Sequence, residues 1–365
     1  MEFRTIPGSG ERVSVIGLGA GSFHCSSPDE QERAVSIALD AGVNVMDFIP
    51  SEASGFEGIV RALKGRRDRA MLQVHIGACY DSGRYGWTAD AKKAIPEFEA
   101  RLRSLGTDYA DFGFVHCVDE RSDFDKVVHG GILDYALRQK EAGAIRHLAF
   151  STHSAEIALM FIELGVFDWA MFSINPMYDY TDESPYGKGG AEDRMRLYRA
   201  FESAGIGVSV MKAFAGGQLL DAAQSPFGQA LTRSQCIQYA LDKPGVCTVL
   251  PGVRGVEDVE EILAFAHASL EERDYSALAS MSPTSREGRC VYCNHCQPCP
   301  QGIPIGLANK YYDLARQGDE LARDHYLTLD ANASACTCCG HCDRRCPFGV
   351  EQSARMRKID AYFSS

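Results

Sequence analysis

The 365-residue sequence lacks the features of an exported or membrane-inserted chain. No stretch approaches ~18 consecutive apolar residues, which is the length that a transmembrane helix requires. The first ten residues, 1–10, show neither the basic nor the apolar region of a secretory signal peptide. We therefore expect a cytoplasmic protein with no membrane partner.

Basic residues are also in short supply. Lys and Arg number 37 against 49 Asp and Glu, which gives a net charge of −12 and a poor surface for nucleic-acid phosphates. The chain is 45% hydrophobic and 24% charged, as in globular proteins with an ample core, and this excludes a disordered or collagen-like chain. We expect a small-molecule substrate and no nucleic-acid partner, and the sequence predicts no particular oligomeric state.

The predicted first domain, residues 1–282, repeats one theme from Val13 to about Ser269, a short β-branched apolar run followed by a stretch of helix length. Eight such runs occur, at Val13–Gly19, Asn44–Phe48, Ala70–Gly77, Tyr109–Val118, Ile145–Thr152, Trp169–Asn175, Gly207–Phe214 and Val246–Gly252. Ser27 and Pro28 mark the start of the first helix. Eight such units predict an α/β fold with a closed parallel (β/α)8 TIM barrel, and a doubly wound open sheet is the alternative.

The glycine-rich segment Gly17–Gly21 follows the first apolar run. It lacks the third glycine of a dinucleotide-binding fingerprint, and the next helix does not begin until Ser27. We therefore interpret this segment as a tight turn at the end of a strand.

The sequence contains 14 cysteines, and nine of them lie in the segment 290–346. A reducing compartment disfavours disulfides and favours metal ligation. The two runs read C-x2-C-x2-C-x2-C-P and C-x2-C-x2-C-x3-C-P, and the second is the bacterial ferredoxin pattern, in which the fourth cysteine reaches the other cluster. Residues 283–365 are therefore predicted to form a small ferredoxin-like domain with two [4Fe–4S] clusters around one helix, Ile305–Gln317.

The spacing assigns four ligands to each cluster. The first set is Cys290, Cys293, Cys296 and Cys346, and the second is Cys336, Cys339, Cys342 and Cys299. A pair of structural zinc sites is the alternative, because C-x2-C pairs also bind zinc. Cys338 is left over, and we expect it to pack against a cluster.

The barrel sequence resembles the aldo-keto reductase family. The resemblance rests on Gly42–Asp47, Arg61–Asp68, Asp108–His116, Ala149–Ser151, Val210–Lys212 and Pro251–Glu261. One branch of this family carries a two-cluster domain after the barrel. The resemblance implies an enzyme that binds NADP(H) or NAD(H) across the carboxyl ends of the strands and transfers hydride to or from a carbonyl carbon.

The family's catalytic tetrad is Asp, Tyr, Lys and His. Asp47 fits the Asp and His116 fits the His, whereas Glu52 falls at the Tyr position and His75 at the Lys position. A solvent-exposed carboxylic acid is ionised at neutral pH. We therefore expect Glu52 to orient or charge a histidine, and His75 or His116 to donate the proton. The same carboxylate and two imidazoles also fit a facial metal triad, which is the alternative site.

The resemblance also implies cofactor contacts. Ser151 fits the contact to the nicotinamide amide, and Lys212 and Arg254 fall where basic groups meet the adenosine phosphates. Met171 occupies the position of the usual Gln, so the phosphate end matches the family better than the nicotinamide end. Cys117 is expected to be a packing residue that points away from the site.

Three functions remain open. Nicotinamide gives two electrons as hydride whereas each cluster passes one, so the two communicate only through an intermediary such as flavin, which the sequence does not predict. We favour an iron–sulfur oxidoreductase that acts on a small carbonyl, hydroxyl or activated unsaturated substrate, with an external electron-transfer protein. The alternatives are a nicotinamide-dependent reductase with structural or redox-sensing clusters, and a non-redox lyase, isomerase or metal-assisted hydrolase.

Overall fold

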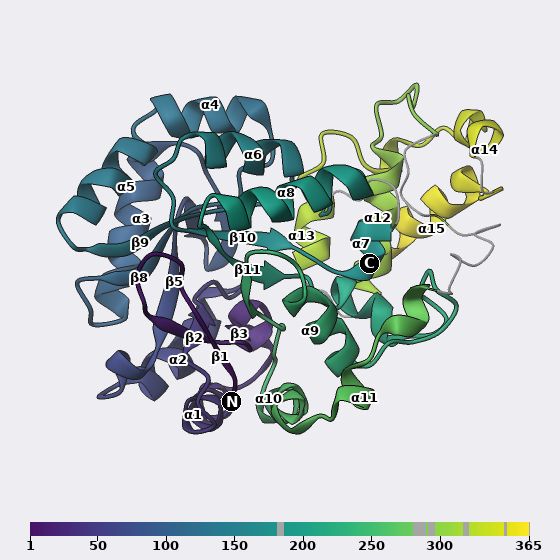
Figure 1. Cartoon of the computed structure of the whole chain (residues 1–365). Coiled ribbons are helices and arrows are strands. Elements are labelled where there is room, and N and C mark those ends of the chain that lie inside the picture. The colour runs from purple at the N-terminus through teal and green to yellow at the C-terminus, as the bar shows by residue number, and fades with distance from the viewer. Residues whose placement is uncertain (181–185, 280–289, 291–295, 317–320, 347–348, 365) are drawn as a thin grey trace.

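The computed structural model describes residues 1–180, 186–279, 290, 296–316, 321–346 and 349–364 (Figure 1). The predicted domain boundary at 282 and 283 and the predicted ligand Cys293 lie outside the described residues. None of the helices in these ranges is long and apolar enough to cross a membrane.

Eight parallel strands curl into a (β/α)8 barrel. In sheet order they are β3 (Leu18–Gly19), β4 (Val45–Asp47), β5 (Met71–Ile76), β8 (Ala110–Val115), β9 (Ile145–Thr152), β10 (Trp169–Ser173), β11 (Gly207–Met211) and β12 (Val246–Val249). Parallel bridges from Ile16 to Val249 and from Gly19 to Gly252 join the first strand to the last. The eight predicted strands and the closed barrel are therefore confirmed, and the open sheet is not.

The first predicted strand is divided between two sheets. Its beginning forms β2 (Arg12–Ser14), which pairs with β1 (Phe3–Thr5) in an antiparallel hairpin. Val13 packs with Phe112 and Trp169 in a core cluster that is separate from the main one. Within the glycine-rich segment, Leu18 and Gly19 form β3, and Ala20 and Gly21 begin a 3-10 helix, Ala20–Cys25, so the predicted tight turn is replaced by a strand end that leads directly into this helix.

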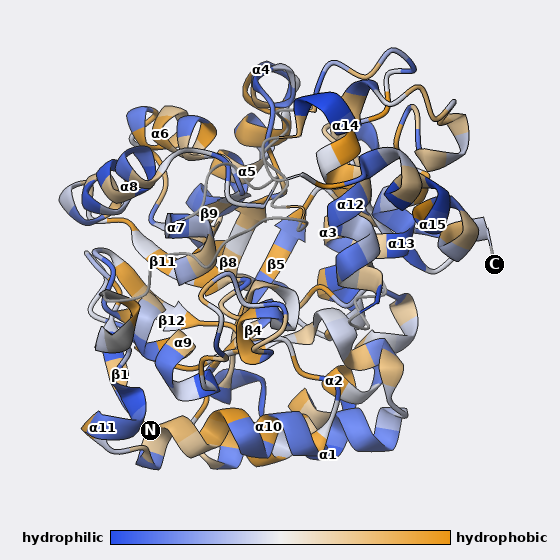
Figure 2. Cartoon of the chain, turned by 90° about the vertical axis from the view of Figure 1, so that its right-hand side faces the viewer, coloured by the Kyte–Doolittle hydropathy of each residue, from blue (hydrophilic) through white to orange (hydrophobic). Residues whose placement is uncertain are grey.

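Helices cover the outside of the barrel. They are α1 (Pro28–Asp40), α2 (Phe56–Leu63), α3 (Ala91–Ser104), α4 (Arg121–His129), α5 (Ile132–Glu141), α6 (Ala155–Glu163), α8 (Ala191–Ser203), α9 (Arg233–Leu241) and α10 (Val256–Leu263), with the short α7 (Pro176–Tyr180) and α11 (Leu270–Arg273) between them. Ser27 caps α1 as predicted, because its side chain accepts the backbone N–H of Glu30. Helices α1 and α10 lie side by side, where the first and last units meet (Figure 2).

A second hairpin, which the sequence analysis did not predict, follows β5. Strands β6 (Ala78–Asp81) and β7 (Arg84–Trp87) pair with Tyr80 opposite Tyr85. The two turn residues Ser82 and Gly83 both have positive φ, as two-residue hairpin turns of the primed type require. Because the hairpin follows the carboxyl end of β5, it brings new side chains to the barrel mouth.

The tail is helical in its described residues and contains no strand there. Its helices are α12 (Ile305–Ala315), α13 (Leu321–Leu327), α14 (His341–Arg345) and α15 (Gln352–Ser364). The predicted helix is confirmed as α12, and the other three were not predicted. The tail has its own core cluster, comprising Cys296, Ile303, Ile305, Ala308, Tyr326, Ala333, Cys342, Met356, Ile359 and Phe363.

The tail packs against the mouth side of the barrel (Figure 1). Tyr186 of the barrel and His325 of α13 are hydrogen-bonded at 2.9 Å, and Arg84 of the hairpin forms an ion pair with Asp324 at 3.3 Å. The Lys310 ammonium lies 3.6 Å from the centroid of the Tyr186 ring. The tail therefore lies next to the candidate site.

Candidate functional site

A chain of hydrogen bonds crosses the carboxyl ends of three neighbouring strands. Asp47 ends β4, His75 lies in β5, and His116 directly follows β8. The Asp47 Oδ1 and His75 Nε2 atoms are 2.7 Å apart, and the Nδ1 atoms of His75 and His116 are 2.8 Å apart. The barrel therefore brings together three of the four predicted tetrad residues.

Tyr85 extends this chain from the unpredicted hairpin. Its hydroxyl lies 2.5 Å from Nε2 of His116. If Asp47 is ionised it can only accept, so His75 donates from Nε2 and accepts at Nδ1. His116 then donates from Nδ1, which leaves its Nε2 to accept the Tyr85 hydroxyl. One set of neutral tautomers thus satisfies every link in the chain.

Burial reinforces this protonation pattern. Desolvation lowers the pKa of His116 well below its ordinary value, and the nearby His75 acts in the same direction. Burial also raises the pKa of Tyr85 well above that of an exposed phenol. At neutral pH the site therefore holds a neutral imidazole, His116, beside a neutral phenol, Tyr85.

Glu52 does not join the chain. Its backbone bridges to Arg84 of the hairpin, and among the described residues its side chain has no hydrogen bond or ion pair. The carboxylate that contacts His75 is Asp47, so the expectation that Glu52 orients a histidine is not met in this geometry. The facial metal triad is disfavoured as well, because all four ring nitrogens of His75 and His116 are hydrogen-bonded within the protein.

An open cleft of about 590 Å³ reaches His116. The residues that line it are Trp87, Thr88, Ala89, Asp90, Ala91, His116, Cys117, Val118, Asp123, Lys126 and Gly130. The chain of hydrogen bonds therefore reaches a space that can hold a small molecule.

The three residues expected to contact a nicotinamide cofactor, Ser151, Lys212 and Arg254, each have different partners in the structure. Ser151 is buried, and its Oγ accepts the backbone N–H of Cys117 at 2.8 Å. The Lys212 ammonium lies 4.7 Å from the Tyr186 ring centroid. Arg254 is 67% exposed and forms two hydrogen bonds to Asp258, which raise its pKa. Two basic groups thus lie at the carboxyl ends of the strands, as a dinucleotide phosphate requires, but Arg254 is held by a carboxylate.

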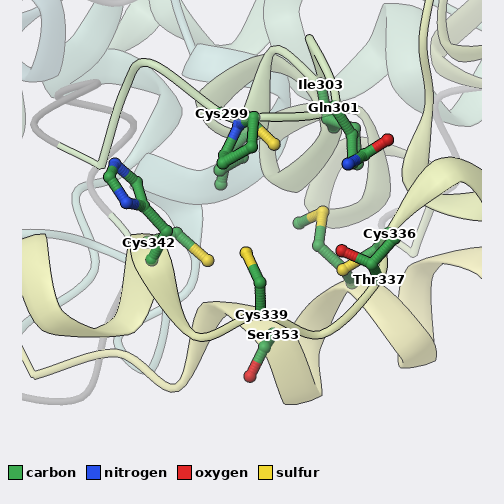
Figure 3. A pocket seen from close by; sticks show the side chains of 12 residues that line it. Cys299, Gln301, Ile303, Cys336, Thr337, Cys339, Cys342 and Ser353 are labelled. Atoms are coloured by element: carbon green, nitrogen blue, oxygen red, sulfur yellow. The ribbon is translucent and has the colours of Figure 1, made fainter.

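Four cysteines of the tail converge on one pocket (Figure 3). They are Cys299, Cys336, Cys339 and Cys342, which is the second predicted ligand set. The described cysteines form no disulfide, so these thiols are available as ligands. Four sulfur donors around one small space fit an iron–sulfur cluster or a zinc ion.

The first predicted ligand set is described only in part, because Cys293 lies outside the described residues. Sγ of Cys290 accepts a hydrogen bond from Nε2 of Gln352 at 3.5 Å. Cys296 is buried, and Cys346 is half-buried after α14. Cys338 is exposed, as is the neighbouring predicted ligand Cys339.

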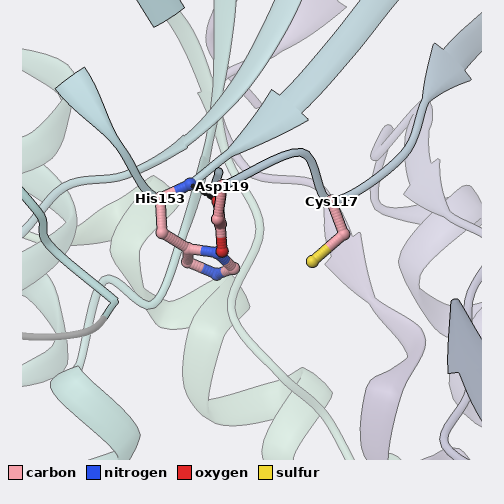
Figure 4. Close-up of side chains that lie close together, drawn as sticks. All are labelled: Cys117, Asp119 and His153. Atoms are coloured by element: carbon pink, nitrogen blue, oxygen red, sulfur yellow. Dashed lines mark hydrogen bonds and ion pairs between the residues drawn. The ribbon is translucent and has the colours of Figure 1, made fainter. Parts of the chain in front are cut away.

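A further group of side chains at the mouth was not predicted from the sequence. Cys117, Asp119 and His153 lie together at the mouth, with one potential ligand atom from each within 4.8 Å of the others (Figure 4). Cys117 lines the cleft, so the expectation that it points away from the site is wrong. Its positive φ of 51° redirects the side chain and breaks the alternation that a regular strand would impose.

A closed parallel barrel with polar side chains at the carboxyl ends of its strands defines a (β/α)8 enzyme. Residues 15–235 match the model of the aldo/keto reductase family, and the chain belongs to this family. Members of the family are oxidoreductases.

Relatives and solved structures agree with this assignment. The chain is 24% identical over 293 residues to an uncharacterized oxidoreductase of Bacillus subtilis, YqkF, covering 73% of this chain and 92% of the relative. A Bacillus halodurans aldo-keto reductase in its holo form matches with a TM-score of 0.60 and 21% identity over 75% of this chain and 94% of its own. A Klebsiella pneumoniae aldo/keto reductase in complex with NADP and acetate matches with a TM-score of 0.55 and 17% identity over 77% and 94%.

Proposed function

We propose that this protein is an iron–sulfur oxidoreductase that interconverts a small carbonyl compound and its alcohol, or reduces an activated unsaturated substrate, in the cleft beside His116. The observation that carries the proposal is the hydrogen-bonded chain from Asp47 through His75 and His116 to Tyr85. Carbonyl redox chemistry moves a proton on oxygen together with a hydride on carbon, and this chain can supply the proton path.

The resting tautomers favour proton removal from a hydroxyl group. A substrate hydroxyl that donates to the Tyr85 oxygen lets the phenol proton pass to His116, the His116 proton pass to His75, and the His75 proton pass to Asp47. For carbonyl reduction the chain must first take up one proton. The proton transfers then occur in the opposite direction, from Asp47 through His75 and His116 to Tyr85 and the substrate oxygen. Glu52 stays a candidate for positioning substrate, because its backbone pairs with the hairpin that carries Tyr85.

NADP(H), or NAD(H), is the proposed hydride carrier, and the complex of the Klebsiella pneumoniae relative with NADP supports this choice. When bound, the nicotinamide supplies or accepts the hydride. Ser151, Lys212 and Arg254 would hold it, and Arg254 would exchange Asp258 for a phosphate. Arg254 and Asp258 are hydrogen-bonded to each other in this structure. A phosphate group must break these bonds before it can bind Arg254, and this reduces the binding energy of the phosphate.

Two [4Fe–4S] clusters are the proposed metal centres of the tail. The convergence of Cys299, Cys336, Cys339 and Cys342 on one pocket supports the second cluster, and the partly described set around Cys290 would hold the first. Such clusters pass single electrons, so an external electron-transfer protein is the proposed partner.

The experiment is a turnover assay on anaerobically purified protein with NADPH or NADP⁺ and a panel of short aldehydes, ketones and alcohols. Binding of the nucleotide is followed separately by calorimetry. We expect NADPH to bind, and we expect the Arg254→Ala substitution to reduce the affinity for NADPH more than the affinity for NADH. Arg196→Ala is the matched control, because Arg196 is 69% exposed and, like Arg254, pairs with a nearby carboxylate. Absence of heat with either nucleotide would refute the nicotinamide assignment.

A second candidate function follows from the same resting tautomers. A site poised to receive a proton also suits a non-redox lyase or isomerase, with structural or redox-sensing clusters. Substrate turnover without any nucleotide, and without change in cluster absorbance, would favour this function.

A further inference from the structure

We propose that Cys117 is a nucleophilic thiol, assisted by His153 and Asp119, that adds to the carbonyl carbon of an aldehyde in the cleft. The proposal goes beyond hydride transfer, which needs no covalent bond to the protein. It also narrows the substrate class, because aldehydes add thiols readily and ketones do so poorly.

The three side chains are arranged as nucleophile, base and orienting group. Oδ2 of Asp119 lies 2.8 Å from Nδ1 of His153, and the sulfur of Cys117 lies within 4.8 Å of both partners' ligand atoms (Figure 4). A proton on Nδ1 held by the carboxylate leaves Nε2 unprotonated, which is the tautomer that a general base requires.

Asp119 is fixed by three further constraints. Its Oδ1 accepts the backbone N–H of His153 at 2.6 Å and the hydroxyl of Thr152 at 3.0 Å. Burial raises the pKa of Asp119, but the charge and hydrogen bonds of His153, followed by the charge of Lys188, outweigh burial and lower this pKa far below its usual range. The carboxylate therefore stays ionised and holds the His153 ring in one orientation.

The backbone directs the Cys117 thiol into the cleft. Its φ of 51° lies in the left-handed region, which a residue with a Cβ adopts at an energetic cost. Two hydrogen bonds to Ser151 hold this conformation, one from the N–H of Cys117 to Oγ at 2.8 Å and one from the N–H of Val118 to the carbonyl oxygen at 3.0 Å. The strand end thus maintains a strained residue that is one of those lining the cleft.

Charges of both signs surround the Cys117 thiol. Burial, and after it the Asp119 carboxylate, raise the pKa of Cys117 well above that of a free thiol, and Lys212 and Lys188 act in the opposite direction. The resting sulfur is therefore protonated, and it needs a base when it attacks. The Lys212 and Lys188 ammonium groups stabilise negative charge that develops on sulfur and so partly offset burial and Asp119.

The step balances without an oxidant. The sulfur lone pair forms a C–S bond to the carbonyl carbon while the C=O π bond breaks, and the electron pair moves to oxygen. The thiol proton passes to His153 and from there to the new alkoxide. The product is a hemithioacetal, and the reverse step releases the aldehyde unchanged.

The test is a timed alkylation of the anaerobic, full-length protein with limiting iodoacetamide, followed by peptide mass spectrometry. The exposed thiol of Cys25 serves as an internal standard, and the buried Cys247 marks the unreactive limit. We expect Cys117 to react, and His153→Gln and Asp119→Asn each to slow its reaction, the former by about 100-fold. His129→Gln is the control histidine variant, because His129 is exposed at the end of α4.

Aldehyde protection provides a second measurement. Preincubation with propanal should slow the alkylation of Cys117 more than that of Cys25, and acetone should have little effect. The proposal is overturned if Cys117 is as unreactive as Cys247, or if His153→Gln and Asp119→Asn, shown by circular dichroism to be folded, react like the wild type. One equivalent of tightly bound zinc that blocks Cys117 would overturn it too, in favour of a metal site.

Discussion

Replacing Tyr85 with phenylalanine tests the hydrogen-bonded chain directly, because it removes one oxygen atom and keeps the ring. The loss leaves Nε2 of His116, which lies 2.5 Å from that oxygen, without its donor. An unsatisfied polar atom costs about 1–3 kcal/mol of unfolding free energy. A protein with a typical stability of about 5–15 kcal/mol stays folded after such a loss.

The effect on turnover should be larger than the effect on folding. Removal of a general acid or base typically reduces the rate by about 10²–10⁴-fold, which is equivalent to about 3–5 kcal/mol in the barrier. The hydrogen bond from Tyr85 also stabilises the neutral form of His116, so its removal should raise the pKa of His116. We expect kcat to fall, KM to change little, and a histidine resonance to titrate at higher pH in a nuclear magnetic resonance experiment.

Tyr80→Phe is the matched control, since Tyr80 lies opposite Tyr85 on the same hairpin. Its hydroxyl donates to the carbonyl oxygen of Pro50 at 2.7 Å and takes no part in the chain. The reasoning is refuted if Tyr85→Phe retains turnover within about twofold, or if both variants lose it equally.

Three further predictions follow. Because burial lowers the pKa of His116, alcohol oxidation should be independent of pH above neutrality and decline only in acid, and an acidic optimum in the initial-rate profile would contradict this. Asp179→Ala should cost about 3–5 kcal/mol in urea unfolding, because Asp179 is hydrogen-bonded at 2.8 Å to Arg194, whose side chain is fully buried. Cys339→Ser should reduce the iron content from about eight to about four atoms per chain while Cys338→Ser leaves it unchanged, and zinc without sulfide in the wild type would refute the clusters.

The strands could be predicted because their signal is local. Each apolar run such as Ile145–Thr152 is buried on both faces of the barrel wall, and burial on both faces produces continuous hydrophobic sequence. The β6 and β7 hairpin has a weaker signal. Its turn pair Ser82 and Gly83 and the flanking Tyr80 and Tyr85 are the cues that could have revealed it.

The chemistry at the mouth could be predicted only in part, because a residue that aligns with a family position in the sequence need not occupy that position in the folded site. Counting from Asp47 places Glu52 at the family's tyrosine position, yet the phenol that contacts His116 comes from the hairpin after β5. Tyr85 and His116 are 31 positions apart, and no periodicity in the sequence connects them.

This relocation changes what the phenol can do. Where the family places a lysine ammonium to stabilise phenolate, this chain places His75, whose nitrogens bridge Asp47 and His116. In the set of tautomers that satisfies the chain, His75 is neutral and supplies no positive charge, so the tyrosinate form gains little support. The phenol instead has an acceptor, Nε2 of His116, and can lose its proton only while it gains another from the substrate. The site is therefore better suited to relay a proton through Tyr85 than to store negative charge on it, and this is why the loss of Tyr85 should affect kcat more than KM.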